Sequence, residues 1–102
     1  MAPGDPLDTV ARRYREVRAA VDRAAAAAGR DPATVRLLAV TKTVPPEGLR
    51  AAYAAGARLF GENYVQEAQG KVDTLPRDAA WHMIGHLQSN KARLAVESFD
   101  WI

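Results

Sequence analysis

The stretch Leu37-Leu38-Ala39-Val40-Thr41-Lys42-Thr43 decides the fold, because it reads as a short buried strand that ends on a lysine. Turn signals bound the apolar run on both sides, with Gly29-Arg30-Asp31-Pro32 upstream and Pro45-Pro46 downstream. A bounded run of this kind is typical of a parallel strand that is covered on both faces. We therefore predict a strand over residues 37–41.

Lys42 is the polar residue at the carboxyl end of this strand. Because strand side chains alternate, Leu38, Val40 and Lys42 share one face. The carboxyl ends of parallel strands carry the chemistry in α/β folds, and partial desolvation there would favour the neutral, nucleophilic amine. The alternative is that Lys42 simply reaches solvent where the strand ends, as most lysines do.

Composition restricts the class of protein. The chain has 102 residues, of which 48% are hydrophobic and 25% charged, and its formal net charge is +2. These values suit one small domain over 1–102 and indicate neither a nucleic-acid nor a membrane partner. The absence of cysteine excludes disulfides and thiolate metal sites. No signal-like or membrane-spanning run is present, so we expect a cytoplasmic protein.

Helical and strand patterns alternate along the rest of the chain. An N-terminal helix should start at Asp5-Pro6 and end near residue 28, before Gly29. Three further helices are predicted: one from Pro46 to before Gly56, one capped by Asn63 and ended by Pro76, and one capped by Ser89 or Asn90. Further strands are predicted over 57–61, 81–85 and 99–102. Right-handed βα crossovers then give four parallel strands in sequential order, an α/β fold that forms part of a TIM (β/α)8 barrel.

Polar side chains follow the carboxyl ends of the first three predicted strands. They are Lys42, then Glu62 and Asn63, then His86 and Gln88. Parallel strands bring these positions to one edge of the sheet. Asn63 suits either an N-cap or a ligand contact, and the two roles are compatible. His82 lies inside a strand without an HExxH partner, so we expect no metal site and interpret it first as a core histidine.

Three motifs in register carry a family resemblance. They are Ala-Val-Thr-Lys-Thr at 39–43, Phe-Gly-Glu-Asn-Tyr-Val-Gln-Glu at 60–67 and Trp-His-Met-Ile-Gly-His-Leu-Gln-Ser-Asn-Lys at 81–91. Together they closely resemble the pyridoxal phosphate homeostasis protein family, from the first helix onward. The resemblance implies a barrel similar to the N-terminal domain of alanine racemase. It also implies pyridoxal 5′-phosphate (PLP) held as a Schiff base on Lys42, and a non-catalytic role in vitamin B6 homeostasis.

The resemblance also implies further cofactor-binding residues, and this sequence differs from the family in its length. Asn63 matches a family residue near the cofactor ring, and the expected cofactor-binding set is Lys42, Asn63 and His82. A full barrel needs about 250 residues, and the family's phosphate loops and the arginine that faces the pyridine nitrogen lie in a second half that this sequence does not contain. We therefore expect a truncated or split member, which pairs with itself or with a complementary half-barrel.

Two other functions stay open at this stage. One is a PLP-dependent racemase or decarboxylase, although Tyr53 and Tyr64, both within predicted helices, make unconvincing second bases. The other is an inactive fragment. Lys71 and Lys91 lie in helical segments that we expect to be exposed and protonated, so cofactor should attach preferentially at Lys42.

Overall fold

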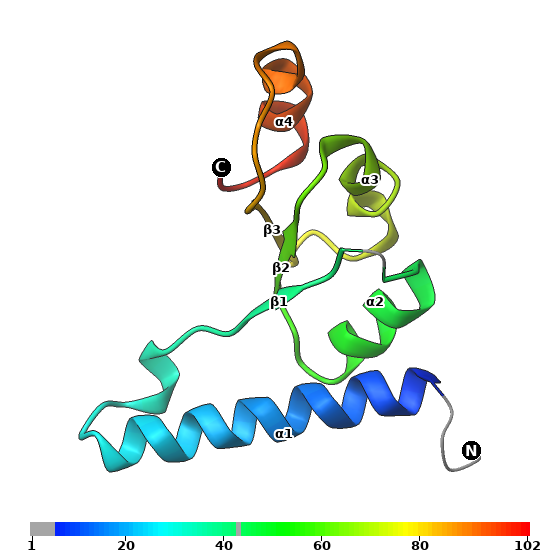
Figure 1. Ribbon diagram of the computed structural model, residues 1–102. Helices are drawn as coiled ribbons and strands as arrows, with labels where there is room; N and C mark the ends of the chain where they lie inside the picture. The colour runs from blue at the N-terminus through cyan, green and yellow to red at the C-terminus, as the bar shows by residue number, and fades with distance from the viewer. Residues whose placement is uncertain (1–5, 43) are drawn as a thin grey trace.

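The computed structural model describes residues 6–42 and 44–102, and it shows a three-stranded parallel sheet flanked by helices (Figure 1). The elements in chain order are α1 (Pro6–Ala27), η1 (Pro32–Thr34), β1 (Leu38–Val40), α2 (Pro46–Ala54), β2 (Leu59–Glu62), α3 (Val65–Gln69), η2 (Val72–Thr74), β3 (Ala80–Met83), η3 (Ser89–Lys91) and α4 (Ala92–Ser98).

The strands are parallel and lie in the order β1-β2-β3, which confirms the predicted parallel α/β arrangement and its sequential order. The register aligns Val40 with Gly61 and Gly61 with His82. Aligned residues of parallel strands face the same side of a sheet. These three residues therefore form one row across one face.

The predicted fourth strand over 99–102 is reduced to a single parallel bridge between His82 and Trp101. The reason is local. The Trp81 N–H donates to the side-chain oxygen Oδ2 of Asp100 at 2.7 Å rather than to a backbone carbonyl. Backbone pairing with β3 involves only Asp100, whose N–H donates to the Trp81 carbonyl at 2.8 Å, and Trp101, whose carbonyl accepts from the Met83 N–H at 2.7 Å, among the described residues. The short fourth strand that we predicted is therefore present only as this parallel bridge in the described chain.

Glycines end the first two helices as expected. Gly29 and Gly56 follow α1 and α2 with φ values of +78° and +117°, a region that favours glycine. The helix α1 ends at Ala27, close to the expected position. The predicted cap Asp5 lies outside the described residues.

The two later helices start differently from the prediction. Tyr64, not Asn63, is the N-cap of α3, and no side chain caps that helix. The helix ends at Gln69, and η2 follows it. A short 3₁₀ turn, η3, occupies the segment where Ser89 or Asn90 was expected to cap the fourth helix, and no side-chain cap forms there. Both capping predictions are therefore wrong.

The two faces of the sheet differ in burial. On the helix-covered face, Phe60 and Trp81 stack with their ring centroids 5.2 Å apart, and Leu49 of α2 is fully buried in the same core. On the other face, which we call the open face, Val40 is 52% exposed and Trp101 is 61% exposed. The expectation that β1 is covered on both faces is therefore wrong, and large apolar side chains lie uncovered.

Candidate functional site at the carboxyl ends of the strands

Lys42 lies in a turn directly after β1 and is exposed. The turn is anchored at Thr41, which is buried and donates its N–H to the Gly61 carbonyl at 2.9 Å. The Thr41 carbonyl in turn accepts from the Val44 N–H at 3.0 Å. The exposure contradicts our expectation that Lys42 is partly desolvated.

The register of β2 and β3 places Asn63 relative to His82. Asn63 is partly buried and lies two residues beyond Gly61, the residue that aligns with His82. His82 is also partly buried, and its ring stacks on Trp101 with the centroids 6.0 Å apart and the planes 13° apart. Its Nε2 atom is buried and has no hydrogen-bond partner among the described residues. His82 is therefore not the satisfied core histidine that its place in a strand indicated.

A polar cleft of about 340 Å³ opens at the carboxyl ends of β2 and β3. It brings together several of the predicted residues with others, and its lining is Asn63, Tyr64, Val65, Gln66, Met83, His86, Gln88 and Lys91. Lys91 is partly buried, which corrects our expectation of an exposed helical lysine. Lys42 does not line this cleft.

Gly85 makes this end of the sheet tight. A Cβ atom at Gly85 would lie 2.5 Å from the Asn63 carbonyl oxygen and 2.9 Å from its Cα. Real side chains do not approach a backbone so closely, so only glycine fits here. The close contact holds the turn after β3 against the turn that carries Asn63.

Glu62 does not line the cleft; it lies on the helix-covered face and is 0% exposed. Its Oε1 atom lies 2.7 Å from Nζ of Lys71, which is only 6% exposed. The Lys71 Nζ also lies 2.8 Å from Oε1 of Glu67 and donates to the Thr41 carbonyl at 2.8 Å. The expectation that Lys71 is exposed is therefore wrong. The helix α3 ends before it, and its side chain turns inward.

The protonation of Lys71 follows from these contacts. Burial acts to lower the pKa of Lys71, but the hydrogen bonds to Glu62 and Glu67 and the charges of both carboxylates outweigh it and raise the pKa above its usual value. Lys71 therefore carries its charge at neutral pH. A buried ammonium whose three N–H groups face three acceptors is unsuited to act as a nucleophile.

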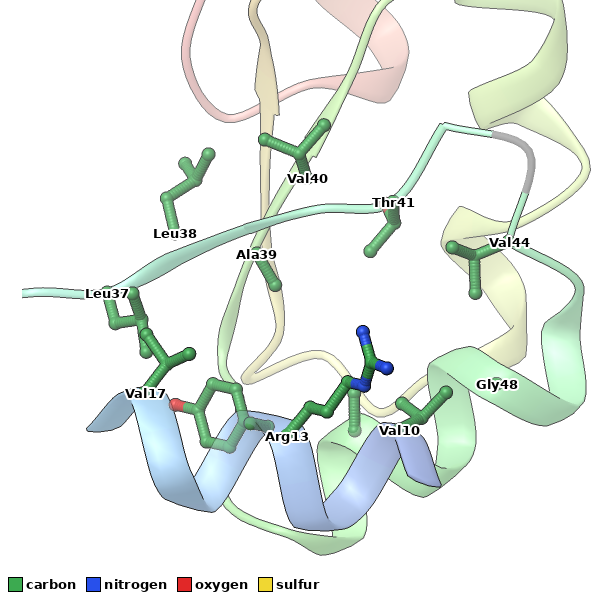
Figure 2. Close-up of a pocket in the computed structure, with 12 residues that line it drawn as sticks. Val10, Arg13, Val17, Leu37, Leu38, Ala39, Val40, Thr41, Val44 and Gly48 are labelled. Carbon is green, nitrogen blue, oxygen red and sulfur yellow. The ribbon is translucent and has the colours of Figure 1, made fainter. Parts of the chain in front are cut away.

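A second cavity, an apolar groove of about 530 Å³, lies between β1 and α1 (Figure 2). Figure 2 shows Ala39 and Thr41 directed into it and Leu38 and Val40 directed away. The groove therefore lies on the helix side of the sheet. Lys42, Asn63, His86 and Gln88 do not line it.

The two tyrosines weighed as second bases lie in different surroundings. The Tyr53 hydroxyl donates to Asp78, and this hydrogen bond raises the pKa of Tyr53. Arg58 stacks on the Tyr53 ring at 3.8 Å and completes a surface cluster. Tyr64 is exposed and lines the polar cleft.

Within residues 6–42 and 44–102, no three metal-ligating side chains of histidine, cysteine, aspartate or glutamate gather closely enough to hold an ion. The described helices include none with the length and apolar content that a bilayer crossing requires.

Comparison with known proteins finds close relatives, although no family model matches the chain. A pyridoxal phosphate homeostasis protein of Pseudomonas aeruginosa is 52% identical over 99 residues, which cover 94% of this chain and 42% of that protein. The protein of the same name from Escherichia coli K12 is 43% identical over 99 residues, covering 93% and 42%. The chain thus spans about two fifths of the length of the curated relatives it matches.

Solved structures agree with these relatives. PipY of Synechococcus elongatus PCC7942, solved with PLP bound, is 53% identical with a TM-score of 0.63, and the match covers 80% of this chain and 40% of that one. The crystal structure of an unknown protein from Bifidobacterium adolescentis is 30% identical with a TM-score of 0.87, and the match covers 98% of this chain and 46% of that one.

Proposed function

This chain belongs to the pyridoxal phosphate homeostasis protein family, and we propose that it binds pyridoxal 5′-phosphate, with Lys42 as the residue of covalent attachment. One observation supports this proposal above the others. PipY, 53% identical to this chain over the matched part, was solved with PLP bound. When bound, the cofactor supplies an aldehyde that a lysine amine can attack and a phosphate that needs cationic or N–H donors.

The surroundings of the lysines support the choice of Lys42. The chain contains Lys42, Lys71 and Lys91. Lys71 is buried and held by three acceptors, and Lys91 is partly buried at the polar cleft. Lys42 is exposed at the carboxyl end of a parallel strand, the end at which barrel folds place their chemistry.

Asn63 and His82 suit the orienting of a polar ligand on the open face. The buried Nε2 of His82 lacks a partner among the described residues, and a buried polar atom gains by finding one. The carboxamide of Asn63 offers both a donor and an acceptor at the carboxyl end of β2. We propose that these side chains contact the cofactor beside Lys42.

Further polypeptide would complete this site. The open face exposes Val40, Ile84 and Trp101, and an uncovered apolar surface of this kind marks an interface. We propose that a complementary half-barrel, or a second copy of this chain, covers the face and supplies phosphate contacts. Loss of about three charge-assisted hydrogen bonds to the phosphate, at about 1.5–3 kcal/mol each, would otherwise weaken cofactor binding by about a thousandfold or more.

We favour a non-catalytic role over a racemase-like enzyme. The relatives carry the name of homeostasis proteins. A racemase needs a second base, and the Tyr53 hydroxyl is engaged with Asp78 and has a raised pKa. A cytoplasmic location stays a prediction of the sequence.

Titration with PLP, followed by absorbance, tests the proposal. The wild-type chain should develop a band of protein-bound cofactor that Lys42→Ala lacks. Arg93→Ala serves as the control, because Arg93 is an exposed cation of α4 that pairs with Glu97 at 3.2 Å. It should keep the band. An identical band in Lys42→Ala would refute the assignment of Lys42.

A further inference from the structure

We propose that Lys71 is a positioning residue, which fixes the backbone carbonyl of Thr41 and so sets the direction in which Lys42 leaves the sheet. The inference rests on the proposed function, because it concerns how Lys42 is presented to the cofactor.

The ammonium of Lys71 contacts three different elements. Its Nζ atom lies 2.7 Å from Glu62 Oε1 at the end of β2, 2.8 Å from Glu67 Oε1 in α3 and 2.8 Å from the carbonyl oxygen of Thr41 after β1. The ammonium donates hydrogen bonds to Thr41 and Glu67 and forms an ion pair with Glu62. The side chain therefore joins the carboxyl ends of two strands to the helix beside them.

Hydrogen bonds fix both the backbone N–H and the backbone carbonyl of Thr41. Its N–H donates to the Gly61 carbonyl at 2.9 Å, and its carbonyl accepts from the Val44 N–H at 3.0 Å as well as from Lys71. A carbonyl oxygen has two lone pairs, and both are used here. That carbonyl belongs to the peptide plane shared with Lys42, and the plane is rigid. Fixing the carbonyl therefore fixes the backbone from which the Lys42 side chain departs.

The burial of the ion pair between Lys71 and Glu62 indicates that Lys71 does more than stabilise the fold. Glu62 is fully buried, and Lys71 nearly so. Replacing a buried ion pair by well-packed apolar side chains is often neutral or stabilising. Stability alone therefore gives no reason for an ammonium at this position, whereas an apolar side chain could not donate to the Thr41 carbonyl. The location, one residue before the proposed attachment site, connects the pair to the presentation of Lys42.

The test compares attachment at two lysines within one molecule. The paired variant, Lys71→Met/Glu62→Gln, removes the donor to Thr41 and leaves no unpaired buried charge. The control, Glu67→Gln, removes one carboxylate but keeps the bond between Lys71 and Thr41. Each protein is incubated with PLP, reduced with borohydride and digested. Mass spectrometry then gives the ratio of labelled Lys42 to labelled Lys91.

The ratio should fall about tenfold or more in the paired variant, because a charge-assisted hydrogen bond that favours one orientation is worth at least that factor. In Glu67→Gln it should stay within about twofold of wild type. Labelling at increasing PLP concentration separates the two steps of attachment. A loss of positioning lowers the maximal rate at Lys42 and leaves the half-saturating concentration nearly unchanged, whereas a general loss of structure changes both.

Circular dichroism establishes that each variant is folded. If the paired variant is not folded, Lys71→Leu/Glu62→Leu replaces it, because two apolar side chains can pack in the buried site and neither can donate to the Thr41 carbonyl. A folded variant with the wild-type ratio would overturn the positioning role and leave the proposed function intact. A wild-type chain without preference for Lys42 would instead contradict the proposed function itself.

Discussion

Lys71→Met should destabilise the fold strongly, because it leaves the fully buried carboxylate of Glu62 without its cation. Removing one partner of a buried ion pair costs about 3–5 kcal/mol. The free energy of unfolding of a small domain is only about 5–15 kcal/mol, so this single change removes a large part of it. The Thr41 carbonyl adds little to the cost, since it keeps the hydrogen bond from the Val44 N–H.

Urea denaturation followed by circular dichroism measures the effect through the shift of the midpoint. The paired variant, which also changes Glu62 to glutamine, should recover most of the loss because no buried charge is left unpaired. Glu67→Gln is the matched control. The Glu67 side chain is 28% exposed, so its pairing is worth about 1 kcal/mol or less. Equal midpoints for Lys71→Met and wild type would show that Glu62 is hydrated rather than buried and would refute this reasoning.

Three further predictions concern pH, packing and edge pairing. The pKa of Lys71 is raised in the folded state, so the stability that depends on its charge is fully present below its unfolded pKa of about 10.4. That stability is lost as the pH rises through the folded-state pKa. Urea midpoints should show this alkaline loss in wild type and not in the paired variant. Gly85→Ala should lower the free energy of unfolding by about 1–3 kcal/mol, because the added Cβ would meet the Asn63 backbone. Gly70→Ala should be nearly neutral or stabilising, because its Cβ would have its nearest neighbour at 3.7 Å. Thermal melts of the two variants compare these effects. The amide of Trp101 should exchange with solvent faster than the amides of β2, since it belongs to an isolated bridge, and slow exchange would indicate that a partner strand covers this edge.

The parallel sheet and its strand order were predictable because glycine and proline residues clearly mark the ends of the helices and strands. Gly29, Gly56 and the proline pair at the start of α2 separate short apolar runs from amphipathic segments, and no hairpin signal intervenes. The fourth strand was not predictable from the apolar run at the end of the chain. The Asp100 side chain takes the hydrogen bond that a strand backbone would have made, and this depends on its position against Trp81.

The site was predictable only in part. Strand ends correctly indicated that Asn63, His86 and Gln88 would lie together, because parallel strands bring them to one edge. The burial of Lys71 was missed, since a lysine in a helical segment is usually solvated. Two signals could have indicated it: Glu67 precedes Lys71 by four residues, and strand alternation places Glu62 on the same face as buried Phe60. The exposure of Lys42 depends on what covers the open face, which the sequence pattern does not specify.

Mapping the attachment of PLP tests the central claim most directly. Wild-type protein and Lys42→Ala are each incubated with PLP, reduced with borohydride, digested and analysed by mass spectrometry. We expect most of the label on Lys42 in wild type, none on Lys71, and no increase at Lys91 when Lys42 is removed. Equal labelling of Lys42 and Lys91 in the wild-type chain would contradict the claim, because Lys42 would then react as an ordinary exposed lysine.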